Sequence, residues 1–199
     1  MKLFLAGASG VLGRRLVPLL VEAGHEVVGL TRNESKRSIL EDLGAEPLVG
    51  DVFDSEWLMD AVATSAPDLV LSQLTDLPDD FDQIGEYTSA NARIRREGVA
   101  NLLEAARRSG VVEQFFAQSV AWELPGDGGR AVMEMESRVL DAGGTVLRYG
   151  QFYGPDTFYP AIPPRPPRIH VDEAARRTVS ALANRGGVHE LIEDGDSVP

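Results

Sequence analysis

Short apolar runs alternate with stretches in which apolar residues recur at helical spacing, and this alternation predicts strands separated by helices. The apolar runs have the length and composition of buried strands. They comprise residues 2–6, 25–30, 46–51, 69–74, part of 111–120, 145–149 and 188–192. Because strands that alternate with helices form a parallel sheet covered on both faces, the chain is expected to be a single α/β domain over residues 1–199.

The stretches between these runs predict the helices. They comprise a helix from Val11 onward, residues 35–43, a helix capped by Asp54, residues 82–109, 130–142 and 172–184. In the long stretch 82–109, Gly85 and Gly98 weaken the pattern locally and Gly110 ends it. Residues 125–129, which include three glycines and one proline, predict a flexible loop.

The first strand is followed at once by Gly7, Gly10 and Gly13, and then by a helix. Gly7 lets the chain turn, Gly10 lets the backbone approach a pyrophosphate, and Gly13 lets the helix pack against the sheet. The N-terminus of that helix offers free N–H groups to phosphates. This context predicts a Rossmann-type doubly wound sheet that binds a dinucleotide, although three glycines in an ordinary turn are the alternative.

The end of the second strand indicates which dinucleotide is bound. An acidic residue there binds the ribose of NAD, whereas an arginine suits the 2′-phosphate of NADP. Here the residue is Arg32, with Lys36 and Arg37 close behind. The sequence therefore favours NADPH/NADP+ as the cofactor, unless Arg32 is merely a solvated loop charge.

The composition narrows the classes of partner. The chain has 199 residues, a net charge of −12 and no cysteine. The negative charge argues against nucleic acid or an anionic membrane as a partner, and the lack of cysteine fits a cytoplasmic protein without disulfides. No apolar run reaches the length of a membrane span, the first residues read as a strand rather than a signal peptide, and the three histidines are too scattered for a metal site.

Several segments resemble the short-chain dehydrogenase/reductase superfamily, in its extended and atypical branches. They are GASGVLGRRLVPLLVEAGHEV, LTR at 30–32, GDVFD at 50–54, NARIRREGVANLLEAARRSGV at 91–111, TVLRYGQFYGP at 145–155 and IHVDEAARRTVSAL at 169–182. The resemblance and the positions at strand ends together imply a set of cofactor-binding residues. They are Gly7, Ser9, Gly10, Val11, Leu12, Gly13, Arg32, Lys36, Asp51, Val52, Gln73, Leu74, Thr75, Asn91, Tyr149, Gln151 and Phe152.

The chain departs from the family's catalytic pattern. The family uses a serine at the end of the fifth strand, which Ser119 matches, and a Tyr-x-x-x-Lys pair on the next helix. If Glu136 is aligned with the acid that follows this pair, Gly128 and Val132 occupy the tyrosine and lysine positions. There is no tyrosine or lysine between Asn91 and Arg148. Ser119 is then expected either to hydrogen-bond a substrate carbonyl or to cap a backbone group.

The second departure is the proline-rich segment 156–168. The resemblance implies a substrate-binding insertion here, and the chain instead has five prolines within residues 160–167. Such a segment predicts a stiff, extended strap, which we expect to fold as a lid over the nicotinamide end. The residues expected to contact substrate or form this lid are Tyr153, Tyr159, Pro163, Pro164, Arg165 and Pro166.

These features resemble the atypical ketoreductases that tailor aromatic polyketides, including angucyclinones. The resemblance implies NADPH-dependent reduction of a polycyclic aromatic ketone, with the proton supplied by Tyr149, Tyr153 or Tyr159, by water, or by a phenol of the substrate. A catalytically silent NADP-binding redox sensor and a cofactor-assisted isomerase or cyclase remain open. The chain could be a monomer or a homodimer.

Overall fold

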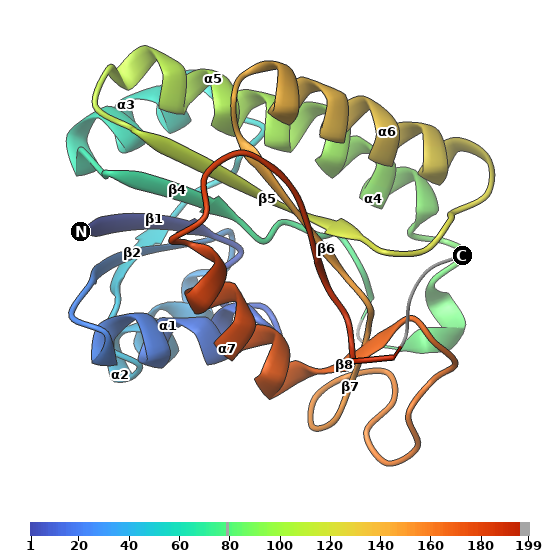
Figure 1. Ribbon diagram of the computed structural model, residues 1–199. Helices are drawn as coiled ribbons and strands as arrows, with labels where there is room; N and C mark the ends of the chain where they lie inside the picture. The colour runs from blue at the N-terminus through green and yellow to red at the C-terminus, as the bar shows by residue number, and fades with distance from the viewer. Residues whose placement is uncertain (79, 196–199) are drawn as a thin grey trace.

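The computed structural model describes residues 1–78 and 80–195, and its centre is a parallel sheet of seven strands in the order β3-β2-β1-β4-β5-β6-β9 (Figure 1). The predicted α/β fold with a doubly wound sheet is therefore confirmed. The strands of this sheet are β1 (Lys2–Ala6), β2 (Glu26–Thr31), β3 (Glu46–Val49), β4 (Leu69–Ser72), β5 (Gln114–Val120), β6 (Thr145–Tyr149) and β9 (Gly187–Leu191).

Helices cover both faces of the sheet. One face carries α1 (Gly13–Glu22), α2 (Arg37–Asp42), which follows the short 3-10 helix η1 (Glu34–Lys36), and α7 (Val171–Ala181). The other carries α3 (Ser55–Ser65), α5 (Val99–Ser109) and α6 (Gly126–Asp141). Asp54 caps α3 as predicted, because its carboxylate accepts the N–H of Trp57 at 3.1 Å.

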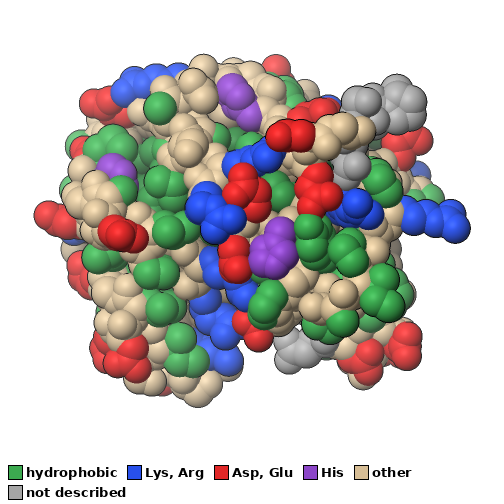
Figure 2. All heavy atoms as spheres, turned by 60° about the horizontal axis from the view of Figure 1, so that its bottom comes forward, with side chains coloured by type: hydrophobic (Ala, Val, Ile, Leu, Met, Phe, Trp, Pro, Cys, Tyr) green, Lys and Arg blue, Asp and Glu red, His purple; other side chains and the backbone are tan. Residues whose placement is uncertain are grey.

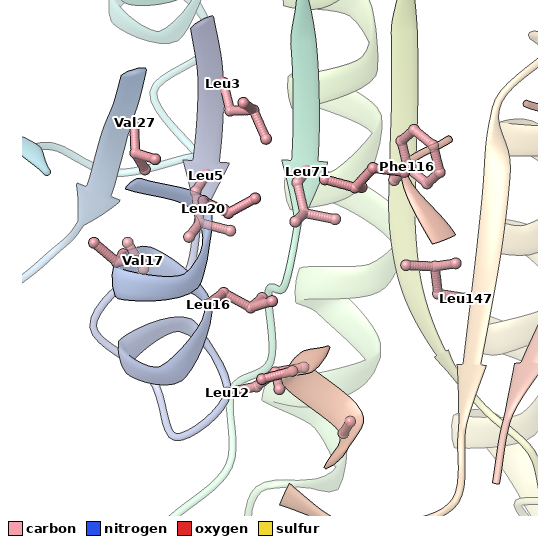
Figure 3. Close-up of a cluster of buried hydrophobic side chains, with 14 of the residues drawn as sticks. Leu3, Leu5, Leu12, Leu16, Val17, Leu20, Val27, Leu71, Phe116 and Leu147 are labelled. Atoms are coloured by element: carbon pink, nitrogen blue, oxygen red, sulfur yellow. The ribbon is translucent and has the colours of Figure 1, made fainter. Parts of the chain in front are cut away.

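Alternate residues of each strand supply the two cores. On β1, Leu3 and Leu5 point toward α1 and α7, whereas Phe4 and Ala6 point toward α3 and α5. Figure 3 shows the first of these cores, in which Leu16 and Leu20 of α1 lie against Leu5. Both cores consist of fully buried apolar side chains, so the sheet is a rigid base for the groups at its edge.

The single long helix predicted over residues 82–109 is wrong. Its first residues form the 3-10 helix η2 (Phe81–Gln83) and turns, and the helical part consists of α4 (Thr88–Arg93), the π-helix η3 (Ile94–Gly98) and α5. Gly98 marks the junction, because a Cβ there would lie 2.9 Å from Ile94 and 3.1 Å from Val52. Gly110 ends α5 as predicted, with a φ of 70°.

The flexible loop predicted at residues 125–129 is also wrong, because α6 begins at Gly126. Pro125 is the N-cap residue, with an extended backbone. Gly129 is needed for packing: a Cβ there would lie 2.1 Å from the carbonyl oxygen of Leu124. The glycines of this segment thus permit a close contact at the first turn of a helix.

The chain after β6 forms a second, two-stranded parallel sheet, in which β7 (Gln151–Tyr153) pairs with β8 (Arg168–His170). The proline-rich segment joins these two strands. Its prediction as an extended strap is wrong, since the chain bends at residues 160–162 and again at 165–167. The bends return the chain to β8, which leads directly into α7.

Candidate functional site

The glycine turn between β1 and α1 has the geometry of a phosphate cradle. A Cβ on Gly7 would lie 2.5 Å from the carbonyl oxygen of Gln73, and one on Gly13 would lie 2.3 Å from the carbonyl oxygen of Gly7. A Cβ on Gly10 would meet only the carbonyl oxygen of Gly7, at 3.3 Å. Gly7 and Gly13 must therefore be glycines, because a side chain at either position would clash with the backbone. The space beside Gly10 is otherwise open, so a ligand can come close to its backbone.

Backbone donors face this cradle. In the part of the chain that the structure describes, the N–H groups of Val11, Leu12 and Gly13 donate to no protein group. They lie at the N-terminus of α1, where such donors and the helix dipole attract phosphate. Ser9 supports the turn, because its hydroxyl and that of Thr31 at the end of β2 are 2.8 Å apart. The residues present therefore fit the pyrophosphate of a dinucleotide.

Arg32 lies beyond the end of β2 with most of its side chain exposed. Its guanidinium donates to the carboxylate of Asp76 at 2.6 Å, and this bond raises the pKa of Arg32. Asp76 follows β4, and its own N–H donates to Asn91 of α4 at 3.2 Å. Lys36 lies nearby in η1, with no salt bridge to the described residues. Arg32 thus lies at the predicted strand end, but it forms an ion pair with Asp76 that was not predicted from the sequence.

Most of the other predicted cofactor residues also lie at the carboxyl edge of the sheet. Asp51 and Val52 follow β3; the carboxylate of Asp51 accepts the N–H of Phe53, and Val52 is buried against Asn101 of α5. Leu74 and Thr75 follow β4 and are partly buried. Gln151 and Phe152 lie in β7, beside the strand that returns from the proline-rich segment.

Tyr149 lies in the core, and so do the polar groups around it. Gln73 donates from Nε2 to the Tyr149 hydroxyl at 3.1 Å. Because the Thr178 hydroxyl donates to the carbonyl of Ala174, Tyr149 must donate its own proton to Thr178, at 2.7 Å. Burial raises the pKa of Tyr149 well above its usual range. The expectation that the Tyr149 side chain supplies a proton is therefore wrong, and contact of this residue with the cofactor stays a prediction.

Ser119 is fully buried beneath α6. Its hydroxyl donates to Oε1 of Glu136 at 2.5 Å, and Arg148 of β6 donates from Nε to the same oxygen at 2.9 Å. Because successive side chains of a strand point to opposite faces of the sheet, the Ser119 side chain points toward the helices on one face and not toward the edge of the sheet. The expectation that it binds a substrate carbonyl is wrong, and it caps a carboxylate rather than a backbone group.

The face of α6 that carries Glu136 also carries Gly128 and Val132, and all of these are buried. α6 itself contains no tyrosine and no lysine. Tyr153 donates to Glu193, which also accepts from Arg168 at 3.0 Å, so its proton is directed away from the sheet edge. An acid–base pair of the usual kind is therefore absent from the described site.

The proline-rich segment contacts the chain that follows β4. The ring of Phe81 lies 5.6 Å from that of Phe158 and 5.8 Å from that of Tyr159, in edge-to-face geometry. Pro164 is buried and its carbonyl accepts from Arg168, while the carbonyl of Arg165 accepts from Gln151; Pro163 and Pro166 are exposed. Whether the segment closes over a cofactor stays a prediction, but it presents aromatic rings beside the β4–α4 connection.

Arg15 attaches the start of this segment to α1. Its guanidinium donates to Asp172 at 2.7 Å and to the carbonyl of Pro155 at 2.8 Å, and it lies 3.2 Å from Asp156. Figure 2 shows basic and acidic side chains interleaved in a band across the face that carries β7 and β8. These contacts of Arg15 were not predicted from the sequence, although the two arginines directly after Gly13 were a signal.

The described residues contain no cluster of His, Cys, Asp or Glu that could hold a metal ion, and no helix among them is long and apolar enough to cross a membrane. A shallow groove of about 1090 Å³ lies between α5 and α6, on their outer face. Its lining includes neither the glycine turn nor Arg32, Ser119 or Tyr149.

Comparison with known proteins agrees with this geometry. The NAD dependent epimerase/dehydratase family matches residues 3–136. The chain belongs to this family. The UDP-glucose 4-epimerase of Thermus thermophilus, solved with NAD, superimposes with a TM-score of 0.80 at 20% identity, over 96% of this chain and 78% of the other. That likeness confirms the fold. The glycine turn lies within residues 3–136, the part of the chain that matches the family.

Two curated relatives are named as reductases. A 3-diazoavenalumate denitrifying reductase from a Streptomyces species is 36% identical over 183 residues, which cover 80% of this chain and 59% of the relative. A 4-hydroxy-2-methyl-3-oxo-4-farnesyl-3,4-dihydroquinoline-1-oxide ketoreductase from Stigmatella aurantiaca is 38% identical over 63 residues, 32% of this chain and 19% of the relative. The chain thus spans well under two thirds of the length of either.

Proposed function

We propose that this protein is an NADPH-dependent reductase that transfers hydride to a flat aromatic substrate, most directly a polycyclic aromatic ketone, without a proton donor of its own. The observation that carries the proposal is the combination of an intact phosphate cradle with an α6 face on which Gly128 and Val132 replace the usual acid–base pair. The two relatives named as reductases support hydride transfer as the reaction class.

The proposal assigns the cofactor to the carboxyl edge of the sheet. The N–H groups at the start of α1 would hold its pyrophosphate, and Arg32, with Lys36 behind it, would hold the 2′-phosphate that distinguishes NADPH from NADH. In this structure the carboxylate of Asp76 neutralises Arg32. When the cofactor binds, the guanidinium of Arg32 would leave Asp76 and bind the 2′-phosphate instead. When bound, the dihydronicotinamide ring supplies a hydride.

The aromatic rings beside the β4–α4 connection support a flat, apolar substrate. Phe81 and Tyr159 come from the two segments that flank the site, and Phe81 is 49% exposed. A ligand that stacks on such rings gains apolar burial together with the favourable geometry of aromatic pairs. A sugar-sized polar ligand would gain neither.

The substrate itself is proposed to manage the proton. Tyr149 and Tyr153 donate to protein acceptors, and Ser119 donates to Glu136, so none of their protons is directed to a ligand. The Tyr159 hydroxyl has no protein partner among the described residues, and the proposal assigns the proton to the substrate rather than to Tyr159. An aromatic ketone with a neighbouring phenol has an internal hydrogen bond to its carbonyl oxygen, which stabilises the alkoxide formed by hydride addition. An angucyclinone of the kind suggested by the sequence has this arrangement, and it is the narrowest form of the proposal.

The test is to mix the protein with NADPH and a panel of polycyclic aromatic ketones, with and without a phenol next to the carbonyl, and to follow the absorbance of reduced nicotinamide. We expect steady oxidation with the phenolic ketones only. NADPH binding without oxidation in the presence of every ketone would refute the reductase and favour the silent redox sensor.

A further inference from the structure

Arg95 is a buried cation without a partner. It lies in η3 and is 6% exposed. Its guanidinium forms no hydrogen bond and no ion pair with any described residue. Burial lowers the pKa of Arg95, and the charge of Glu136 opposes this shift. An arginine stays protonated at neutral pH nevertheless. None of the guanidinium nitrogens of Arg95 is fully buried, so the side chain is mostly covered while its charged end reaches solvent and lacks a protein partner among the described residues.

Glu136, whose charge acts on Arg95, is not that partner. Oε1 of Glu136 accepts from Ser119 and Arg148, and its Oε2 accepts from Arg148. Both oxygens of the carboxylate are therefore engaged by other residues, and neither accepts a hydrogen bond from Arg95. Arg95 remains within electrostatic range of it, but contributes no contact.

The position of Arg95 relates it to the candidate site. Its segment follows α4, whose Asn91 accepts from the chain after β4 at the carboxyl edge of the sheet. The same segment packs against α6. Glu136 lies on the buried face of α6 that also presents Val132, the position at which the family has lysine. The unpaired cation thus lies between α4 and the part of α6 from which the usual catalytic cation is missing.

The next residue, Arg96, does find carboxylates on α6. Arg96 donates to Glu134 at 2.7 Å and to Asp127 at 2.8 Å, both on α6, and is largely on the surface. One arginine of the π-helix therefore binds α6 from outside and the next is turned inward. π-helical turns within α-helices are frequent at functional sites because they redirect side chains.

We propose that Arg95 is the anion-binding residue of the active site and takes a ligand oxygen that carries negative charge. The proposal rests on the reductase function. In the reaction, hydride adds to the carbonyl carbon of the aromatic ketone, the C=O electron pair moves to the oxygen, and a phenol or water then supplies the proton. A fixed guanidinium stabilises that oxygen without giving up a proton. The favoured ligands are therefore aromatic compounds with a phenolate or carboxylate beside the reacting position.

The test uses 1-hydroxy-2-naphthoate and its neutral counterpart 1-hydroxy-2-naphthamide as probes, with NADP+ present, by titration calorimetry. We expect the natural protein to bind the naphthoate at least tenfold more tightly than the naphthamide. Arg95→Gln should abolish this preference, and Arg95→Lys should restore part of it. Arg96→Gln is the matched control and should keep the full preference.

Thermal melting separates this role from a structural one. Because the guanidinium of Arg95 forms no hydrogen bond or ion pair with a described residue, its removal should leave the melting temperature of Arg95→Gln close to that of the natural protein. A lower melting temperature with an unchanged naphthoate preference would overturn the proposal, as would a natural protein that binds both probes equally. A preference that depends on Arg95 in a protein that never oxidises NADPH would refute the reductase and leave the anion site standing.

Discussion

The Ser119 hydroxyl donates to a buried carboxylate, which makes it part of the packing between α6 and the sheet. Ser119→Ala should lower the free energy of unfolding by about 1–3 kcal/mol, because Glu136 loses a buried donor. Turnover per folded molecule should stay unchanged. Urea denaturation gives the first quantity and a ketone assay gives the second. Loss of turnover with normal stability would restore a catalytic role to the serine.

Arg32 makes a contact that a 2′-phosphate would replace. Arg32→Ala should weaken NADPH binding by about 10- to 100-fold, since a charge-assisted bond contributes about 1.5–3 kcal/mol, and should change NADH binding little. Fluorescence titration with both nucleotides measures this. Arg37→Ala is the control, because Arg37 pairs with Glu34 in the same turn. Equal losses for NADPH and NADH would contradict the assignment.

The sequence predicted positions better than it predicted partners. Gly7, Gly13 and Arg32 lie at the expected ends of strands, because motif spacing and strand periodicity determine where a residue falls along an element. The hydrogen bonds of Tyr149 with Gln73 and Thr178 join residues 76 and 29 positions apart, which no local pattern reveals. For that reason the expectation that Tyr149 supplies a proton failed.

The proline-rich segment is an element whose rigidity can be tested. Replacement of Pro163, Pro164, Pro166 and Pro167 by glycine increases the freedom of the chain between β7 and β8. If the segment positions an aromatic ligand, the KM for an aromatic ketone should rise several-fold, with NADPH affinity unchanged. Steady-state kinetics and nucleotide titration measure the two. Unchanged KM would show that the segment is not a lid.

Two helical segments have a structure that their sequence patterns did not predict. The apolar stripe of residues 82–109 is continuous enough to predict one helix, but the close approach of Gly98 to Val52 and the π-turn before it are consequences of packing against α3 and α6. Likewise, Gly126–Gly129 has the composition of a loop and is helical because the chain needs a close contact with Leu124. Tertiary contacts overrode local propensity in both places.

The whole fold followed from the alternation of strands and helices, since that order admits few parallel-sheet topologies. The resulting molecule has a net charge of −12, and two groups that attract anions, the free N–H groups at the start of α1 and the guanidinium of Arg32, lie at the carboxyl edge of its sheet. In an acidic protein, such a local concentration is what an anionic cofactor requires.

Transfer of an isotope label shows whether the protein moves a hydride from NADPH to a ketone. The protein is incubated with NADPH that carries deuterium at the transferable position of the nicotinamide, together with a phenolic polycyclic aromatic ketone. We expect a product alcohol with one deuterium at the former carbonyl carbon, detected by mass spectrometry, and the same result with Ser119→Ala. A protein that binds NADPH tightly and yields no deuterated product from any ketone would contradict it.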